Sequence, residues 1–294
     1  MNAQTEKNSD GFSREKEREG PLSIKTKVFY AFGEMPGAYM NLAIGSFLLI
    51  YYSVVLGASA AAISLVLGVA LFLDAICDPL VGALSDQVKS RLGRRHPMMY
   101  AASIPMGVFI CLLFTPPQGL SATSLIVWLA FFLIMTRVTF TFFSVPWSAL
   151  IAEFSDDYEQ RTVIASYRTL IGPLLGGISS TLILTFIFIG TPDIPKGQEN
   201  LENYNFFGPL IGSLMTGWAL LSTHFTRSEI PYLYQTRSTS SAGLAWMLSS
   251  ILLALKSRNY RILLVSMLVY FGVLGTLSQF DMFVNTYFWD LTAA

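Results

Sequence analysis

The sequence predicts an all-α membrane protein, and two observations lead to this class. Of its 294 residues, 53% are hydrophobic and only 13% are charged, whereas a soluble domain carries about 25% charged residues. The apolar residues also gather in long stretches, each able to form a helix across about 30 Å of hydrocarbon. The net charge is zero, which gives no reason to expect a nucleic-acid partner. The lipid bilayer is the expected environment.

The first expected element is a polar tail, residues 1–27, whose charged sequence without apolar periodicity is typical of a disordered segment. The first membrane helix is expected at 28–56, and the short connection 57–59 makes the second helix antiparallel to it. Polar or proline-containing loops separate the other expected helices, which are 60–84, 97–114, 124–151, 163–189, 207–225 and 260–289.

The longest polar connection divides the membrane region into two parts. Residues 28–225 hold six expected helices, and residues 260–294 hold a seventh. Between them, 226–259 is expected to be a cytoplasmic segment, and its middle, 244–255, is apolar enough for an amphipathic helix at the membrane surface.

The distribution of basic residues predicts the orientation. All of the 19 lysines and arginines except Arg137 and Lys196 lie in the tail or near loops on one side of the membrane. Because loops with many basic residues stay in the cytoplasm, we expect the N-terminus to be cytoplasmic. Cys77 and Cys111 both lie in apolar stretches, and we interpret them as small packing residues rather than a disulfide pair.

Two acids, Asp74 and Asp78, interrupt the second apolar stretch. Their spacing puts them on one face of a helix, one turn apart, and a charged side chain in a membrane is usually buried against the bundle, on an ion or solute path. They could bind sodium or a proton, with hydroxyls from Thr141 and Ser144 as further ligands. The alternative is that the acids pair with Arg137 or Arg168 and serve only helix packing. A combination, in which an arginine neutralises the site until a cation enters, stays open.

A basic loop follows this helix at residues 85–96. It could act as a latch between helix ends that differs between access states, through Asp86, Arg91, Arg94 and Arg95. The alternative is that its arginines only follow the positive-inside rule. Two further residues have both a functional and a structural interpretation. Arg168 could face the substrate or be an anchor at the membrane interface. Trp147 could stack on a ligand ring or be a packing aromatic.

Several motifs together resemble the glycoside-pentoside-hexuronide:cation symporter family, the melibiose permease-like branch of the major facilitator superfamily. They are FYAFGEMPG (29–37), FLDAICDPLVG (72–82), SRLGRRHP (90–97), SVPWSAL (144–150) and EQRTVIASYR (159–168). The resemblance implies twelve helices in two halves that rock around a midplane site. We therefore expect a major facilitator-type helical bundle, here the N-terminal six-helix half plus a seventh helix of a C-terminally truncated member.

The resemblance also implies roles for individual residues. The family's cation site falls on Asp74, Asp78 and Thr141, and Cys77 replaces an asparagine ligand, which weakens the expectation of sodium. Substrate contacts fall on four positions: the sugar-binding arginine on Arg168, the stacking aromatic near Trp147, and two sugar-binding acids on Ala38 and Ser144, neither of which is acidic here.

We therefore predict a cation:solute symporter of the inner cell membrane, with a sugar or sugar-like solute and sodium or a proton as coupling cation. The sequence holds no nucleophile–base–acid set or metal-ligand cluster that would indicate an enzyme or a further cofactor. Two alternatives stay open. One is a truncated, non-transporting membrane protein that acts only through interactions. The other is a lysolipid-type carrier, because SVPWSAL also resembles the sodium-dependent lysolipid carriers of the same branch.

Overall fold

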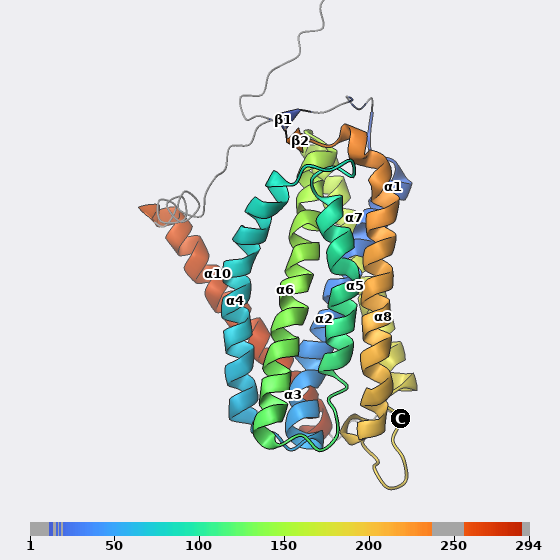
Figure 1. The fold of residues 1–294 in the computed structure, drawn as a ribbon, viewed down its shortest axis with the longest axis vertical. Helices are drawn as coiled ribbons and strands as arrows, with labels where there is room; N and C mark the ends of the chain where they lie inside the picture. Colours follow the sequence, from blue (N-terminus) through green and yellow to red (C-terminus); the bar gives the residue numbers. More distant parts are fainter. Residues whose placement is uncertain (1–11, 14–15, 17, 19, 237–255, 290–294) are drawn as a thin grey trace, which may run out of the picture.

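The computed structural model describes residues 12–13, 16, 18, 20–236 and 256–289. Long helices stand side by side in a bundle, and α10 runs obliquely across one side of it (Figure 1). Within the described residues, seven helical segments are long and apolar enough to cross a membrane. The predicted all-α membrane bundle is therefore confirmed.

The first helical segment runs from residue 24 to residue 55 and begins four residues before the apolar stretch, because the Ser23 side chain accepts a hydrogen bond from the Thr26 backbone N–H and caps it. Three α-helical parts alternate with one 3₁₀ turn and with two π-helical parts. Their order is α1 (Ile24–Ala31), the 3₁₀ turn Phe32–Glu34, α2 (Met35–Met40), the π-helical Asn41–Phe47, α3 (Leu48–Ile50) and the π-helical Tyr51–Val55.

Several of the remaining membrane helices begin before their apolar stretches because polar residues cap their N-terminal ends. Asp157 and Asn200 accept hydrogen bonds from backbone N–H groups in the first turns of α7 and α8, which therefore start five and six residues before the positions expected from hydropathy. The bounds are α4 (Ala60–Gln87), α5 (His96–Leu113), α6 (Ala122–Phe154), α7 (Tyr158–Phe186), α8 (Leu201–Thr226) and α10 (Arg258–Phe283). Shorter pieces are the 3₁₀ turns Gly197–Glu199 and Arg227–Tyr232 and the π-helical Val284–Phe288.

The core lies between the first helical segment, α5, α6 and α8. Helices α5 and α8 approach so closely that a Cβ on Gly107 would lie 2.4 Å from the Gly212 carbonyl oxygen. Such contacts between small residues hold membrane helices together where the hydrophobic effect between helices is absent. Near one end of the bundle, fully buried aromatic rings fill the centre: Phe47, Tyr51, Phe114, Phe188, Tyr204 and Phe207.

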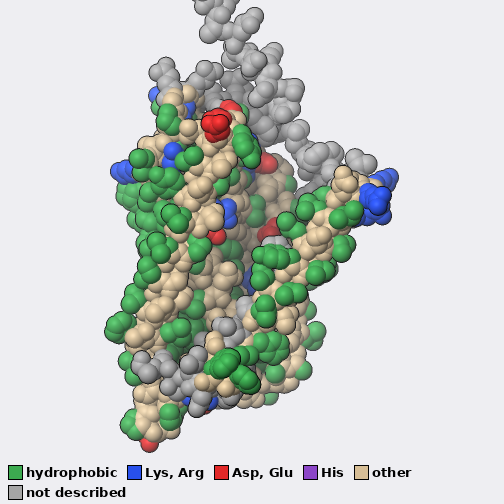
Figure 2. Space-filling model, turned by 180° about the vertical axis from the view of Figure 1, so that it is seen from behind, with side chains coloured by type: hydrophobic (Ala, Val, Ile, Leu, Met, Phe, Trp, Pro, Cys, Tyr) green, Lys and Arg blue, Asp and Glu red, His purple; other side chains and the backbone are tan. Residues whose placement is uncertain are grey.

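Large apolar side chains on α4, α7 and α10 are exposed, as expected for helices that face lipid. Figure 2 shows hydrophobic side chains along the length of the bundle and along α10, with basic side chains at the outer end of α10. The described side chains of α10 are all exposed.

The described part of the N-terminal tail is joined to the segment that follows α8. Strands β1 (Phe12–Ser13) and β2 (Gln235–Thr236) form a two-stranded antiparallel ladder. The buried Glu229 carboxylate accepts a hydrogen bond from Thr26 Oγ1 (2.9 Å) and also pairs with Arg18. We call these contacts the strap. The boundary expected at residue 27 therefore falls inside α1, and the amphipathic helix predicted at 244–255 lies outside the described residues.

Candidate functional site

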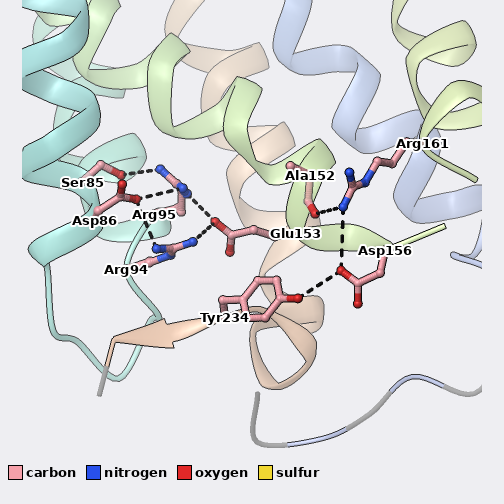
Figure 3. Close-up of polar contacts among 9 residues, drawn as sticks. All are labelled: Ser85, Asp86, Arg94, Arg95, Ala152, Glu153, Asp156, Arg161 and Tyr234. Atoms are coloured by element: carbon pink, nitrogen blue, oxygen red, sulfur yellow. Dashed lines mark hydrogen bonds and ion pairs between the residues drawn. The ribbon is translucent and has the colours of Figure 1, made fainter. Parts of the chain in front are cut away.

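The basic loop brings two arginines onto one buried acid at the end of α6 (Figure 3). Arg94 Nη2 and Arg95 Nε donate to the same Glu153 oxygen, at 2.7 and 2.6 Å. Both guanidinium groups also contact Asp86 at the end of α4, at 3.2 and 3.0 Å. The arrangement joins the ends of α4, α5 and α6 by charge. Arg91 is exposed and lies outside these contacts.

Two polar contacts connect α4 to α6 within the membrane. Arg137 Nη1 donates to Asp74 Oδ2 at 2.5 Å, and Thr141 Oγ1 donates to Asp78 Oδ1 at 3.1 Å. The two acids are four residues apart, and so are their partners, so the contacts lie one turn apart along the two helices. Of the two partners proposed for these acids, the structure brings Arg137 to Asp74, whereas Arg168 has another partner.

Asp74 and Asp78 were both expected to be buried against the bundle, and the structure shows different burial for the two. The Asp74 side chain is 22% exposed, while Asp78 belongs to the exposed residues. Asp78 is thus exposed in the described part of the chain although its Oδ1 accepts from Thr141 of α6, and the expectation that both acids are buried is wrong for Asp78. Cys77 and Ser144 are half-buried on the same two helices.

A cavity of about 720 Å³ lies between the first helical segment and α7. Arg168 Nε donates to Glu34 Oε2 across it at 2.5 Å, and each side chain is about one-third exposed. Further lining residues are Ala38, Asn41, Leu42, Ser46, Ile151, Ala165, Thr169, Gly172, Pro173, Gly176, Gly177 and Ser180. Two of the four predicted substrate positions, Arg168 and Ala38, therefore lie on the cavity wall.

Trp147 lies behind Arg168 rather than on the cavity wall. The Arg168 guanidinium carbon is 4.5 Å from the centre of a Trp147 ring, and Trp147 Nε1 donates to the Tyr30 carbonyl oxygen at 3.0 Å. Trp147 is only 3% exposed. Its indole lies against Gly33, where a Cβ would come within 2.0 Å of Nε1. The tryptophan is therefore held by the first helical segment and in turn supports the arginine.

Sequence reasoning missed two acids of these sites. The sequence alone gives no role to Glu34, near the start of the first expected membrane helix. Glu34, Ala38 and Asn41 nevertheless follow the i, i+4, i+7 spacing of one helix face, and all line the cavity. Glu153 was placed in a loop, but it lies inside α6 and is 3% exposed. The sequence signal that could have found Glu153 is an acid directly next to an apolar stretch. Its arginine partners lie 58 and 59 positions away and give no local pattern.

The comparisons with known proteins place the chain in a family. A family profile described as "MFS/sugar transport protein" matches residues 29–294. The "Putative glycoside/cation symporter YagG" of Escherichia coli (strain K12) is 27% identical over 76% of this chain and 46% of its own length. The "Inner membrane symporter YicJ" of the same strain is 26% identical over 60% of this chain and 39% of its own length.

A mammalian protein is also similar. The "Sodium-dependent lysophosphatidylcholine symporter 1" of Mus musculus is 30% identical over 58% of this chain and 32% of its own length. The chain thus spans less than half the length of each of these three relatives. The family profile and the names of the relatives describe transport proteins and no enzyme class, and they confirm the resemblance that the motifs carry. With nearly the whole length from residue 29 onward matched, the chain belongs to the MFS/sugar transport protein family.

Proposed function

We propose that the protein is a cation:solute symporter that moves a sugar or sugar-like solute across the inner cell membrane, with its N-terminus in the cytoplasm. The observation that carries the proposal is Arg168, a charged group on the wall of a cavity within the membrane region, paired with Glu34 and stacked on Trp147. A charged side chain in the membrane region is costly, so one that is present there usually has a function. The relatives named as glycoside/cation and inner membrane symporters support the solute class and the location.

The Glu34–Arg168 pair fits a polyhydroxyl solute. The guanidinium group offers fixed hydrogen-bond donors and the carboxylate offers acceptors, so adjacent hydroxyls of one sugar ring can bind to both. Asn41, Thr169 and Ser180 add polar groups along the same wall. Because the pair is neutral in sum, the solute needs no net charge to balance it.

Trp147 takes a different part from the one that the resemblance implies. It is buried beneath Arg168 and fixed by its hydrogen bond to Tyr30. We therefore assign it as a positioning residue, which keeps the guanidinium plane directed at the cavity. Ala38 contributes an apolar part of the wall, and Ser144 is assigned to the α4–α6 face beside the cation site.

The proposed cation site lies on α4 and α6. Asp74, Asp78 and Thr141 supply its oxygen atoms, which suit sodium or a proton, and Cys77 lies beside them. The cluster of Asp86, Arg94, Arg95 and Glu153 is the proposed latch at the cytoplasmic end, and Arg91 remains a free basic side chain of that loop among the described contacts. Breaking the latch would release α4 and α5 from α6 when the access state changes.

Uptake tests the proposal directly. The full chain is reconstituted in liposomes and offered a panel of radiolabelled mono- and disaccharides under an inward sodium gradient or an inward proton gradient. We expect at least one sugar to accumulate with one gradient and Arg168→Lys to abolish uptake, because lysine lacks the planar fork of donors. Arg161→Lys, at an arginine outside the cavity, is the matched control. Absence of sugar uptake under both gradients, in a protein shown to be inserted, would contradict the proposal.

A lysolipid is the second candidate solute. Ala38, Leu42 and Ile151 make part of the cavity wall apolar, and one relative is named as a lysophosphatidylcholine symporter. In the same liposome assay, labelled lysophosphatidylcholine replaces the sugars. Uptake of the lysolipid without uptake of any sugar would favour this candidate, and uptake of neither would favour a protein that acts only through interactions.

A further inference from the structure

The Arg137 side chain occupies one half of the proposed cation site. The side chain is 14% exposed, and its Nη1 lies 2.5 Å from Asp74 Oδ2. Asp74 Oδ1 and Arg137 Nε are buried and make no hydrogen bond in the described part of the chain. The pair is therefore enclosed but incompletely bonded, which leaves a carboxylate oxygen available to a competing cation.

The register of the two helices determines what Arg137 does to the site. Arg137 and Thr141 are one turn apart on α6, directly opposite Asp74 and Asp78 on α4. A hard cation binds by collecting several oxygen atoms around itself. With the guanidinium on Asp74, only the Asp78 and Thr141 half of the site offers oxygen atoms that no positive charge already balances.

We propose that Arg137 is a resident counter-ion that competes with the coupling cation for Asp74 and so sets the ion affinity of the site. The inference rests on the proposed function, because it concerns the cation site of the symporter. An entering cation has to draw Asp74 away from Arg137, and an arginine left unpaired in a buried position is costly. The chain's own arginine thus weakens binding of sodium and of a proton alike.

The expected size of the effect follows from the separation of the charges. An opposite charge within about 4–6 Å changes the affinity of a carboxylate for a positive ion by roughly 10- to 1,000-fold. We expect the lower end for sodium, about ten-fold, because Asp78 and Thr141 bind the ion whether or not Arg137 is present.

Cys77 provides a readout that does not require transport, since it lies directly before Asp78 and is half-buried. In a Cys111→Ser background, which removes the other cysteine, a maleimide labels Cys77 in membranes while sodium is titrated against choline. Arg137→Met keeps an unbranched stem and removes the charge, and Arg137→Lys keeps the charge. Arg261→Met is a matched loss of an arginine that is exposed on α10.

We expect Arg137→Met to show protection of Cys77 at a sodium concentration about ten-fold lower than the parent, while Arg137→Lys and Arg261→Met behave like the parent. Equal half-protecting concentrations in the parent and in Arg137→Met would overturn the inference, and so would the absence of any sodium response in Arg137→Met. If Arg137→Met does not insert, Arg137→Gln, which can still donate a hydrogen bond to Asp74, is judged by the same criterion.

The labelling experiment separates the inference from the proposed function. A ten-fold gain in sodium response without uptake of any solute would leave Arg137 as the competitor and reject the symporter. Uptake of a sugar with no difference between the parent and Arg137→Met in sodium response would reject only the role of Arg137.

Discussion

Trp147 supports the Arg168 guanidinium from behind at 4.5 Å, and it is itself hydrogen-bonded to the backbone of the first helical segment. The arginine thus depends on two helices besides its own: α6 supplies the ring, and α1 supplies the Tyr30 carbonyl group that orients it. A change in either element reaches the cavity wall through the same ring.

Trp147→Leu should weaken solute binding by about ten-fold, because a cation–π contact at a partly buried site is worth about 1–2 kcal/mol. Trp147→Phe keeps a ring beneath the arginine and loses only the hydrogen bond to Tyr30, so it should recover part of the affinity. The measurement is the half-saturating concentration of whichever sugar is taken up. Equal values for Trp147→Leu and the parent would show that the ring does not support the arginine.

Gly33→Ala should lower the thermal unfolding midpoint in detergent, because the added Cβ would lie 2.0 Å from Trp147 Nε1. Overpacking of this kind costs about 1–3 kcal/mol. Gly68→Ala in α4 is the matched control. Nothing lies within 4 Å of its added Cβ, so this change should be neutral or should stabilise the helix by roughly 0.5–1 kcal/mol. A midpoint for Gly33→Ala that equals the control would contradict the close packing.

Glu153→Gln should destabilise the protein more than Asp86→Asn does. Glu153 is buried and accepts from both Arg94 and Arg95. Losing its charge therefore leaves two buried guanidinium groups without their buried counter-ion, at a cost of about 3–5 kcal/mol. The Asp86 side chain is 45% exposed, and its loss should cost less than about 1 kcal/mol. Thermal unfolding in detergent compares the two variants. A lower unfolding midpoint for Asp86→Asn than for Glu153→Gln would mean that Asp86 contributes more than Glu153 to stabilising the loop.

Glu229→Gln should loosen the strap, because Arg18 loses its ion pair and Thr26 loses a charged acceptor. Trypsin should then cleave at Lys16 and Arg18 several-fold faster, since local opening exposes a backbone to proteases. Glu202→Gln, an exposed acid in the first turn of α8, is the control. Unchanged cleavage kinetics in Glu229→Gln would show that the strand pairing alone holds the segment.

Hydropathy predicted the membrane helices well because a helix that crosses lipid needs a long apolar stretch, and that requirement is visible in the sequence itself. The errors fall at helix ends. Ser23, Asp157 and Asn200 are polar, so they were placed in loops, yet as caps they start helices several residues before the apolar stretch.

The candidate site could be predicted only in part. Asp74 and Asp78 stand out because acids are rare in apolar stretches, and their spacing already places them on one helix face. Their partners depend on how helices pack. Arg137 was one of two arginines considered for the acids, and only the packing of α6 on α4 decides that it is the partner of Asp74. Glu34 and Arg168, 134 positions apart, meet for the same reason.

The strap has a consequence for how the chain is made. Arg18 and Thr26 reach Glu229 across 211 and 203 positions, and a ribosome adds about 5–20 residues per second. The first helical segment therefore waits on the order of ten seconds or more before its carboxylate partner has been synthesised. Until then Arg18 and Thr26 lack this charged partner, while the Ser23 cap of α1 can already form. The strap can close only when α8 has arrived beside α1, because Glu229 lies in the 3₁₀ turn that directly follows α8.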